Sequence, residues 1–189
     1  MRFVTIFCFL FLIISANAQV QNEKGTLKLQ GSAVYGFDAG FRIDEGALGF
    51  NIGLESFISN QFSLNISYTD YLNQEAEERK VRSGDIFTKR LKVVNLDGRY
   101  YFMSGKIKPY LLLGFAHITN NYEIKTFSTP EMESETSLGC NGGAGVSIEL
   151  NNNLSILYQT KYQITEIDRV AGKIPGQVVI HLGLSYKIR

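Results

Sequence analysis

Most of the chain after residue 24 alternates between apolar side chains and polar or small ones. In residues 62–70, for example, Phe62, Leu64 and Ile66 alternate with serine and asparagine. Strict alternation predicts strands with one apolar and one polar face, because successive side chains of a strand point to opposite sides. No segment after residue 24 has the spacing of an amphipathic helix. Eight segments follow the pattern: 26–37, 47–59, 62–70, 88–102, 107–118, 136–149, 154–164 and 177–188.

The connections between these segments alternate between short and long. The short ones contain Asn, Ser and Gly, which accept turn geometry easily, whereas the long ones hold many of the charges. Strands joined in this way predict an all-β fold, an eight-stranded antiparallel up-and-down barrel. The short connections are 59–61, 103–106 and 151–153, and the long ones are 38–46, 71–87, 119–135 and 165–176.

Small residues and aromatic rings indicate that the apolar face points outward into lipid. Tyrosine and phenylalanine stand near the segment ends, where membrane barrels carry aromatic girdles around an apolar band. Glycine weakens a strand unless a neighbour approaches closely, as in the lumen of a small barrel. We therefore expect a transmembrane barrel with short periplasmic turns and long extracellular loops. The glycines of the polar face are Gly36, Gly49, Gly53, Gly114, Gly139, Gly143, Gly145 and Gly183.

The N-terminus has the pattern of a secretory signal peptide. A basic start at Arg2 precedes the apolar run 3–14, and Ala16-Asn17-Ala18 supplies a cleavage site. We expect residues 1–18 to be removed and residues 19–189 to form one barrel domain. Without Arg2 the basic and acidic residues balance, which gives no support to a nucleic-acid partner. Cys140 is then the one remaining cysteine, so no internal disulfide can form.

The chain resembles the small eight-stranded outer-membrane barrels of the OmpA/OmpX type. The resemblance covers nearly all of residues 25–189 and is carried by the hairpin pattern and three segments. It implies an exported, integral protein of the bacterial outer membrane, of the porin-family type, inserted by the barrel-assembly machinery. The three segments are Lys-Pro-Tyr-Leu-Leu-Leu-Gly-Phe at 108–115, Gly-Cys-Asn-Gly-Gly-Ala-Gly-Val at 139–146 and Leu-Gly-Leu-Ser-Tyr-Lys-Ile at 182–188.

Charged residues fall on the expected inner face, with both signs present. The interior of an eight-stranded barrel is just wide enough to be filled by side chains, and a buried charge needs a partner. We therefore expect a lumen charge network that closes the barrel. The register of 107–118 is left open, because Leu112 falls on the inner face. The lumen charge network consists of Lys28, Glu55, Asp97, Arg99, Glu149 and Lys161.

No motif indicates catalysis, a cofactor or a metal site. Two histidines and one mature cysteine are too few and too scattered for metal-ligand spacing, and no serine accompanies a histidine on the outer face. His181 is expected to form hydrogen bonds in the lumen. The expected function is a non-enzymatic structural, adhesion or surface-display role, with outer-membrane lipid and extracellular or host surfaces as partners. We expect a monomer.

Three other functions stay open at this point, the weakest of them an outer-membrane enzyme. A narrow pore would use the same barrel with a continuous path through the charged lumen. A lipocalin-like periplasmic binder would alternate in the same way, but with its apolar face inside.

Overall fold

The computed structural model describes residues 24–38, 46–72, 74–76, 86–125 and 130–188. The expected signal peptide, residues 1–18, lies outside the described residues, as do most of the long connections 38–46 and 165–176. None of the described residues belongs to a helix long and apolar enough to cross a membrane.

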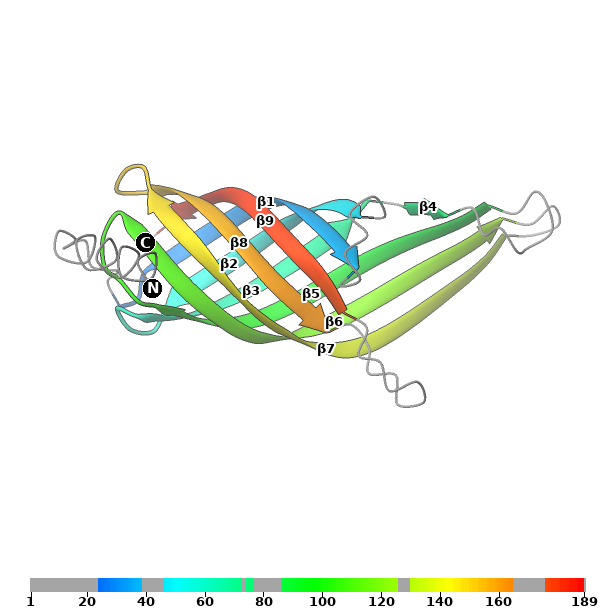
Figure 1. Cartoon of the computed structure of the whole chain (residues 1–189), viewed down its shortest axis with the longest axis horizontal. Helices are drawn as coiled ribbons and strands as arrows, with labels where there is room; N and C mark the ends of the chain where they lie inside the picture. The colour runs from blue at the N-terminus through cyan, green and yellow to red at the C-terminus, as the bar shows by residue number, and fades with distance from the viewer. Residues whose placement is uncertain are drawn as a thin grey trace, which may run out of the picture.

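Eight long antiparallel strands close into a barrel, as the alternation predicts (Figure 1). Pairing follows chain order, and the ring is completed where the first strand pairs with the last and the third with the fifth. The short strand β4 pairs only with β5 and stands outside the ring. The strands are β1 (Leu27–Asp38), β2 (Ala47–Phe57), β3 (Phe62–Tyr71), β4 (Gln74–Ala76), β5 (Ile86–Tyr101), β6 (Ile107–Lys125), β7 (Pro130–Glu149), β8 (Leu154–Ile164) and β9 (Gly176–Lys187).

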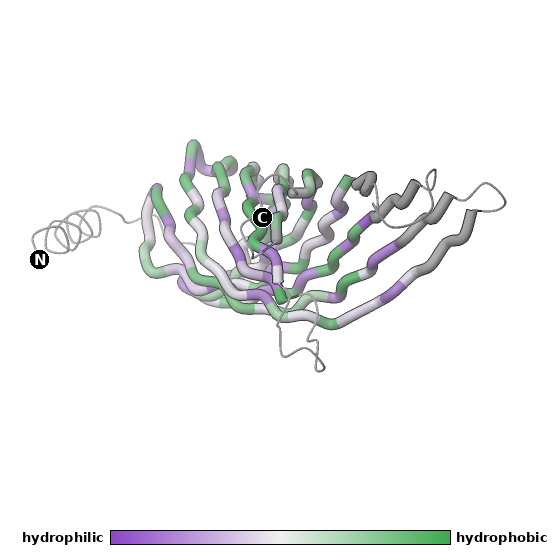
Figure 2. Tube along the Cα trace, turned by 45° about the vertical axis from the view of Figure 1, so that its right-hand side comes forward, coloured by the Kyte–Doolittle hydropathy of each residue, from purple (hydrophilic) through white to green (hydrophobic). Residues whose placement is uncertain are grey.

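Exposure alternates along the strands, and the apolar side chains point outward. On β6, Leu113 is 75% and Phe115 69% exposed, whereas Leu112 is 2% exposed. The open register is therefore resolved with Leu112 inside. Figure 2 shows the same alternation of hydrophobic and hydrophilic positions along the tubes. A continuous apolar exterior of this size suits lipid and contradicts the lipocalin-like alternative, which needs its apolar face inside.

The short turns and both described ends of the chain lie at one end of the barrel. Gly25 N donates to the carbonyl of Phe57 at 2.8 Å, and Ile188 N donates to the carbonyl of Leu27 at 2.8 Å. In the turn before β8, the side-chain oxygen of Asn151 accepts from the amide of Leu154 at 2.8 Å. Such Asx turns satisfy backbone amides locally. In barrels of this type, the end with the short turns faces the periplasm.

The connection 119–135, expected to be a loop, is mostly strand. β6 and β7 continue to pair from Thr119 opposite Thr136 as far as Lys125 opposite Pro130. Figure 1 shows β5, β6 and β7 running past the other strands at the end away from the turns. The expectation was wrong because strands that project beyond the bilayer meet water on both faces, so they need no apolar and polar alternation.

The connection 71–87 is also shorter than expected. Tyr71 belongs to β3, Gln74–Ala76 form β4, and β5 begins at Ile86. Residues 77–82 of the charged run 75–82 lie outside the described part of the chain.

Candidate functional site

The lumen holds a buried ion pair between β2 and β5. An oxygen of Glu55 lies 3.4 Å from a guanidinium nitrogen of Arg99, and the side chains are 1% and 5% exposed. Glu55 also accepts hydrogen bonds from Gln30 at 2.7 Å, Ser63 at 2.6 Å and Tyr101 at 2.7 Å. Charge-assisted bonds of this kind are stronger than neutral ones. The carboxylate is thus bound by four groups from β1, β3 and β5.

Arg99 joins opposite walls of the barrel. Its two terminal nitrogens donate to Gln30 on β1 and to Gln159 on β8, each at 3.1 Å. The guanidinium lies 5.1 Å from the ring centroid of Tyr110 on β6. The hydroxyl of Tyr110 donates to the same oxygen of Gln159 at 3.1 Å. A single side chain therefore crosses the lumen and contacts four strands other than its own, counting Glu55 on β2.

A second polar group surrounds Asp97. Asn141 donates to the side-chain oxygens of Asn95 at 2.8 Å and of Asp97 at 3.1 Å. Lys161 is 2% exposed and Asp97 is 1% exposed. The two charges attract each other, because they face the same part of the lumen from β8 and β5.

The remaining two members of the predicted network lie nearer the turn end. Glu149, on β7, forms an ion pair with Lys108 on β6. Lys28 lies 5.0 Å from the ring centroid of Phe57, a cation–π contact. Sequence reasoning missed Lys108, although its position four residues before Leu112 places both on the same face.

Apolar clusters fill the lumen on both sides of this polar layer. At the turn end, Phe57, Tyr101, Tyr110 and Leu112 form one cluster, with the ring centroids of Tyr101 and Tyr110 at 5.0 Å. At the other end, six buried residues form the second cluster: Val34, Tyr71, Val93, Ala116, Ile118 and Val179. We call these the turn-end cluster and the loop-end cluster. Among the described residues, these two clusters and the polar layer fill successive levels of the lumen.

The lumen retains a cavity of about 20 Å³ beside Arg99 and His181. A cavity of that size holds about one water molecule. Ser32 lies 3.3 Å from Nδ1 of His181, which forms the lumen hydrogen bond expected from the sequence. His117, the other histidine, is exposed on the outer face.

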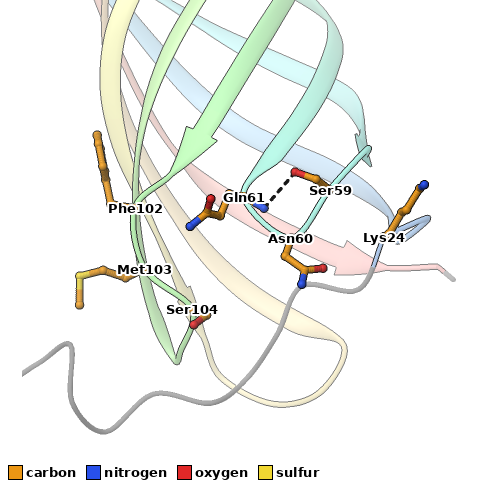
Figure 3. A pocket seen from close by; sticks show the side chains of 7 residues that line it. All are labelled: Lys24, Ser59, Asn60, Gln61, Phe102, Met103 and Ser104. Carbon is orange, nitrogen blue, oxygen red and sulfur yellow. Dashed lines mark hydrogen bonds between the residues drawn. The ribbon is translucent and has the colours of Figure 1, made fainter.

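A wide, open groove of about 520 Å³ lies at the turn end (Figure 3). Its side chains spread along the turns, with Met103 and Phe102 pointing away from Lys24, and do not converge on one point. Among the described residues, no group of three His, Cys, Asp or Glu side chains could hold a metal ion. Nothing in the groove resembles a catalytic constellation.

Comparison with known families gives the family of this chain. Residues 6–187 match the model described as the outer membrane protein β-barrel domain. The chain belongs to this family. Family membership agrees with the closed barrel and its apolar exterior, and it implies the bacterial outer membrane. No curated protein matches the chain.

Solved structures of small surface barrels share the fold. Neisserial surface protein A (NspA) has a TM-score of 0.61 at 18% identity, covering 88% of this chain and 98% of that one. OprG of Pseudomonas aeruginosa has a TM-score of 0.59 at 14% identity, with 90% and 100% covered. Ail, the attachment invasion locus protein of Yersinia pestis, has a TM-score of 0.57 at 18% identity, with 87% and 97% covered, in its complex with the heparin analogue sucrose octasulfate. These similarities show the fold alone.

Proposed function

We propose that this protein is a non-enzymatic, non-conducting barrel that displays the extended strands β5, β6 and β7 on the cell surface. We infer that residues 1–18 direct its export and are then removed. The closed lumen carries the proposal. Among the described residues, two apolar clusters flank a buried polar layer in which Arg99 reaches from β5 to β1 and β8, and a lumen filled in this way supports a barrel that does not conduct ions.

The projecting strands support a role at the surface. The β7–β8 pairing ends at Cys140 opposite Ile164, whereas β7 begins at Pro130. Ten residues of extended strand span about 33 Å. Loops and extensions on a rigid scaffold are frequent sites of binding. Ail, which shares this fold, is named for attachment and invasion, and this makes adhesion the form of surface contact that we propose.

A planar bilayer separates this proposal from the pore alternative. The folded wild-type protein should give no stepwise conductance at any applied voltage, because the clusters and the Glu55–Arg99 pair occupy the lumen. A large porin in the same bilayer is the positive control. Regular single-channel steps that scale with the amount of folded barrel would establish a pore instead.

Surface labelling of intact cells tests the displayed extension. An epitope tag placed between Lys125 and Pro130 should bind antibody on intact cells, because it sits at the tip of the β6–β7 hairpin. The matched control is the same tag between Asn151 and Asn153, in a turn at the opposite end. The control should be labelled only after the outer membrane is permeabilised. Labelling of the control on intact cells would mean that the barrel has the opposite orientation in the membrane to the one proposed.

A further inference from the structure

The outward face of the barrel is almost free of charge. Of the outward strand positions whose side chains the structure describes, charge is found only at Asp70 on β3 and at Arg90 and Lys92 on β5. The three lie together, because Asp70 is the register partner of Lys92 and forms an ion pair of 2.7 Å with Arg90. A charge on a lipid-facing surface is costly unless it reaches the interface, so this grouping needs a physical reason.

These charges lie where the hydrocarbon layer should end. The outward residues of β5 are apolar or glycine from Val94 to Gly98 and aromatic at Tyr100, and Phe102 follows directly after the strand. The ten residue steps from Phe102 to Lys92, at a strand tilt of about 40°, rise about 25 Å, which matches the height of the apolar band of such barrels. Lys92 therefore lies at headgroup depth on the side away from the turns.

The neighbouring strands add polar groups at the same level. Lys92 is the register partner of Thr119 on β6, and Val94 is the partner of His117, whose side chain is exposed. At the same end of the other strands, the described outward positions carry no charge: they are apolar or aromatic, as at Phe37 and Tyr162, or uncharged, as at Thr136 on β7. We call Asp70, Arg90, Lys92, His117 and Thr119 the rim patch. It is a local feature of β3, β5 and β6.

The geometry of Asp70 orients the arginine. Nε and one terminal nitrogen of Arg90 donate to the two carboxylate oxygens at 3.0 and 2.7 Å. The hydroxyl of Tyr68 donates to the same carboxylate at 3.1 Å. Asp70 neutralises the charge of Arg90 and holds its guanidinium group in place. Lys92 therefore supplies the net positive charge of the rim patch. The Arg90 side chain remains 47% exposed, so part of its guanidinium is available to a ligand.

We propose that the rim patch binds the phosphate group of a lipid in the outer leaflet. A phosphate accepts hydrogen bonds from guanidinium and ammonium groups, and cations at headgroup depth attract anionic lipids. The acyl chains of such a lipid would lie along the apolar surface below the patch, on Val94 and Leu96, which are 43% and 51% exposed. Charge complementarity and depth thus favour a phosphorylated lipid over a neutral one.

Native mass spectrometry of the full barrel, titrated in detergent with phosphatidic acid or phosphatidylcholine, tests the proposal. Wild type should bind one phosphatidic acid more tightly than phosphatidylcholine. Lys92→Gln should weaken phosphatidic acid binding about fivefold, the usual effect of one cation near an anionic surface. Asp70→Asn should strengthen it, because a repelling charge is lost and the Arg90 fork is freed.

The matched control is Lys106→Gln, the same change at an exposed lysine in the turn at the opposite end. It should leave the affinity unchanged, and heat-modifiable migration on gels should show that all variants are folded. Equal weakening by Lys92→Gln and Lys106→Gln, weaker binding by Asp70→Asn, or no preference for phosphatidic acid in wild type would each overturn the proposal. Full displacement of the lipid by inorganic phosphate would assign the site to free phosphate instead.

Discussion

Replacing Glu55 with alanine should lower the free energy of unfolding by about 3–5 kcal/mol, because removal of one partner leaves the other charge buried. Arg99 would lose its 3.4 Å ion pair while only 5% exposed. The donors on Gln30, Ser63 and Tyr101 would lose their shared acceptor at the same time. The fraction of folded barrel in vesicles, measured against urea concentration by heat-modifiable migration, gives the unfolding free energy.

Two further variants make the Glu55 result specific. Ser56→Ala changes the next residue, which is exposed on the outer face, and should alter stability by less than about 0.5 kcal/mol. Glu55→Leu combined with Arg99→Met removes both charges and should recover part of the loss, because apolar side chains can replace a buried pair. If Glu55→Ala costs less than about 1 kcal/mol, the pair does not hold the lumen together as described.

Replacing Gly183 with alanine should destabilise the barrel by about 1–3 kcal/mol, the usual cost of overpacking. A Cβ at Gly183 would collide with the carbonyl oxygen of Gly31 and with Cβ of Ser32. β9 cannot move away from this collision without disturbing its strand pairing, because it pairs with β1 on one side and with β8 on the other. Urea unfolding in vesicles, as for Glu55, measures the effect.

Gly31 provides the matched control, because it lies on the neighbouring strand and faces outward. A Cβ at Gly31 would meet no atom within 4 Å. Gly31→Ala should therefore be neutral or should stabilise the protein by up to about 1 kcal/mol, since glycine costs conformational entropy on folding. Equal effects of the two substitutions would mean that inward crowding does not explain the glycines of the lumen face.

The sequence predicts the barrel well because the relevant information is local. Outward Leu113 and inward Asn65 follow from their positions in a two-residue repeat, whatever the rest of the chain does. The eight segments, their faces and the short turns are predicted in this way. The inward glycines are predicted to need space, although the atoms that crowd them are known only from the structure.

The candidate sites depend on non-local geometry. Arg99 contacts Gln30, 69 positions away, and Gln159, 60 positions away. The rim patch has no sequence motif, since Asp70 and Arg90 are 20 positions apart. That the rim patch is the charged part of the outward face becomes visible only when the described outward positions of all strands are compared at the same depth in the membrane.

By itself, the sequence determined which side chain of each strand faces lipid and which faces the lumen, because the backbone repeat of two residues sets that choice locally. Only the tertiary structure decided which charges meet. Glu149 pairs with Lys108, and Glu55 pairs with Arg99 across the width of β3, because strand register and barrel closure bring distant positions to one level. The tertiary structure also decided how far β5, β6 and β7 project beyond the other strands. The projecting segments pair in water, so their sequence needs no apolar and polar alternation by which a strand could be recognised.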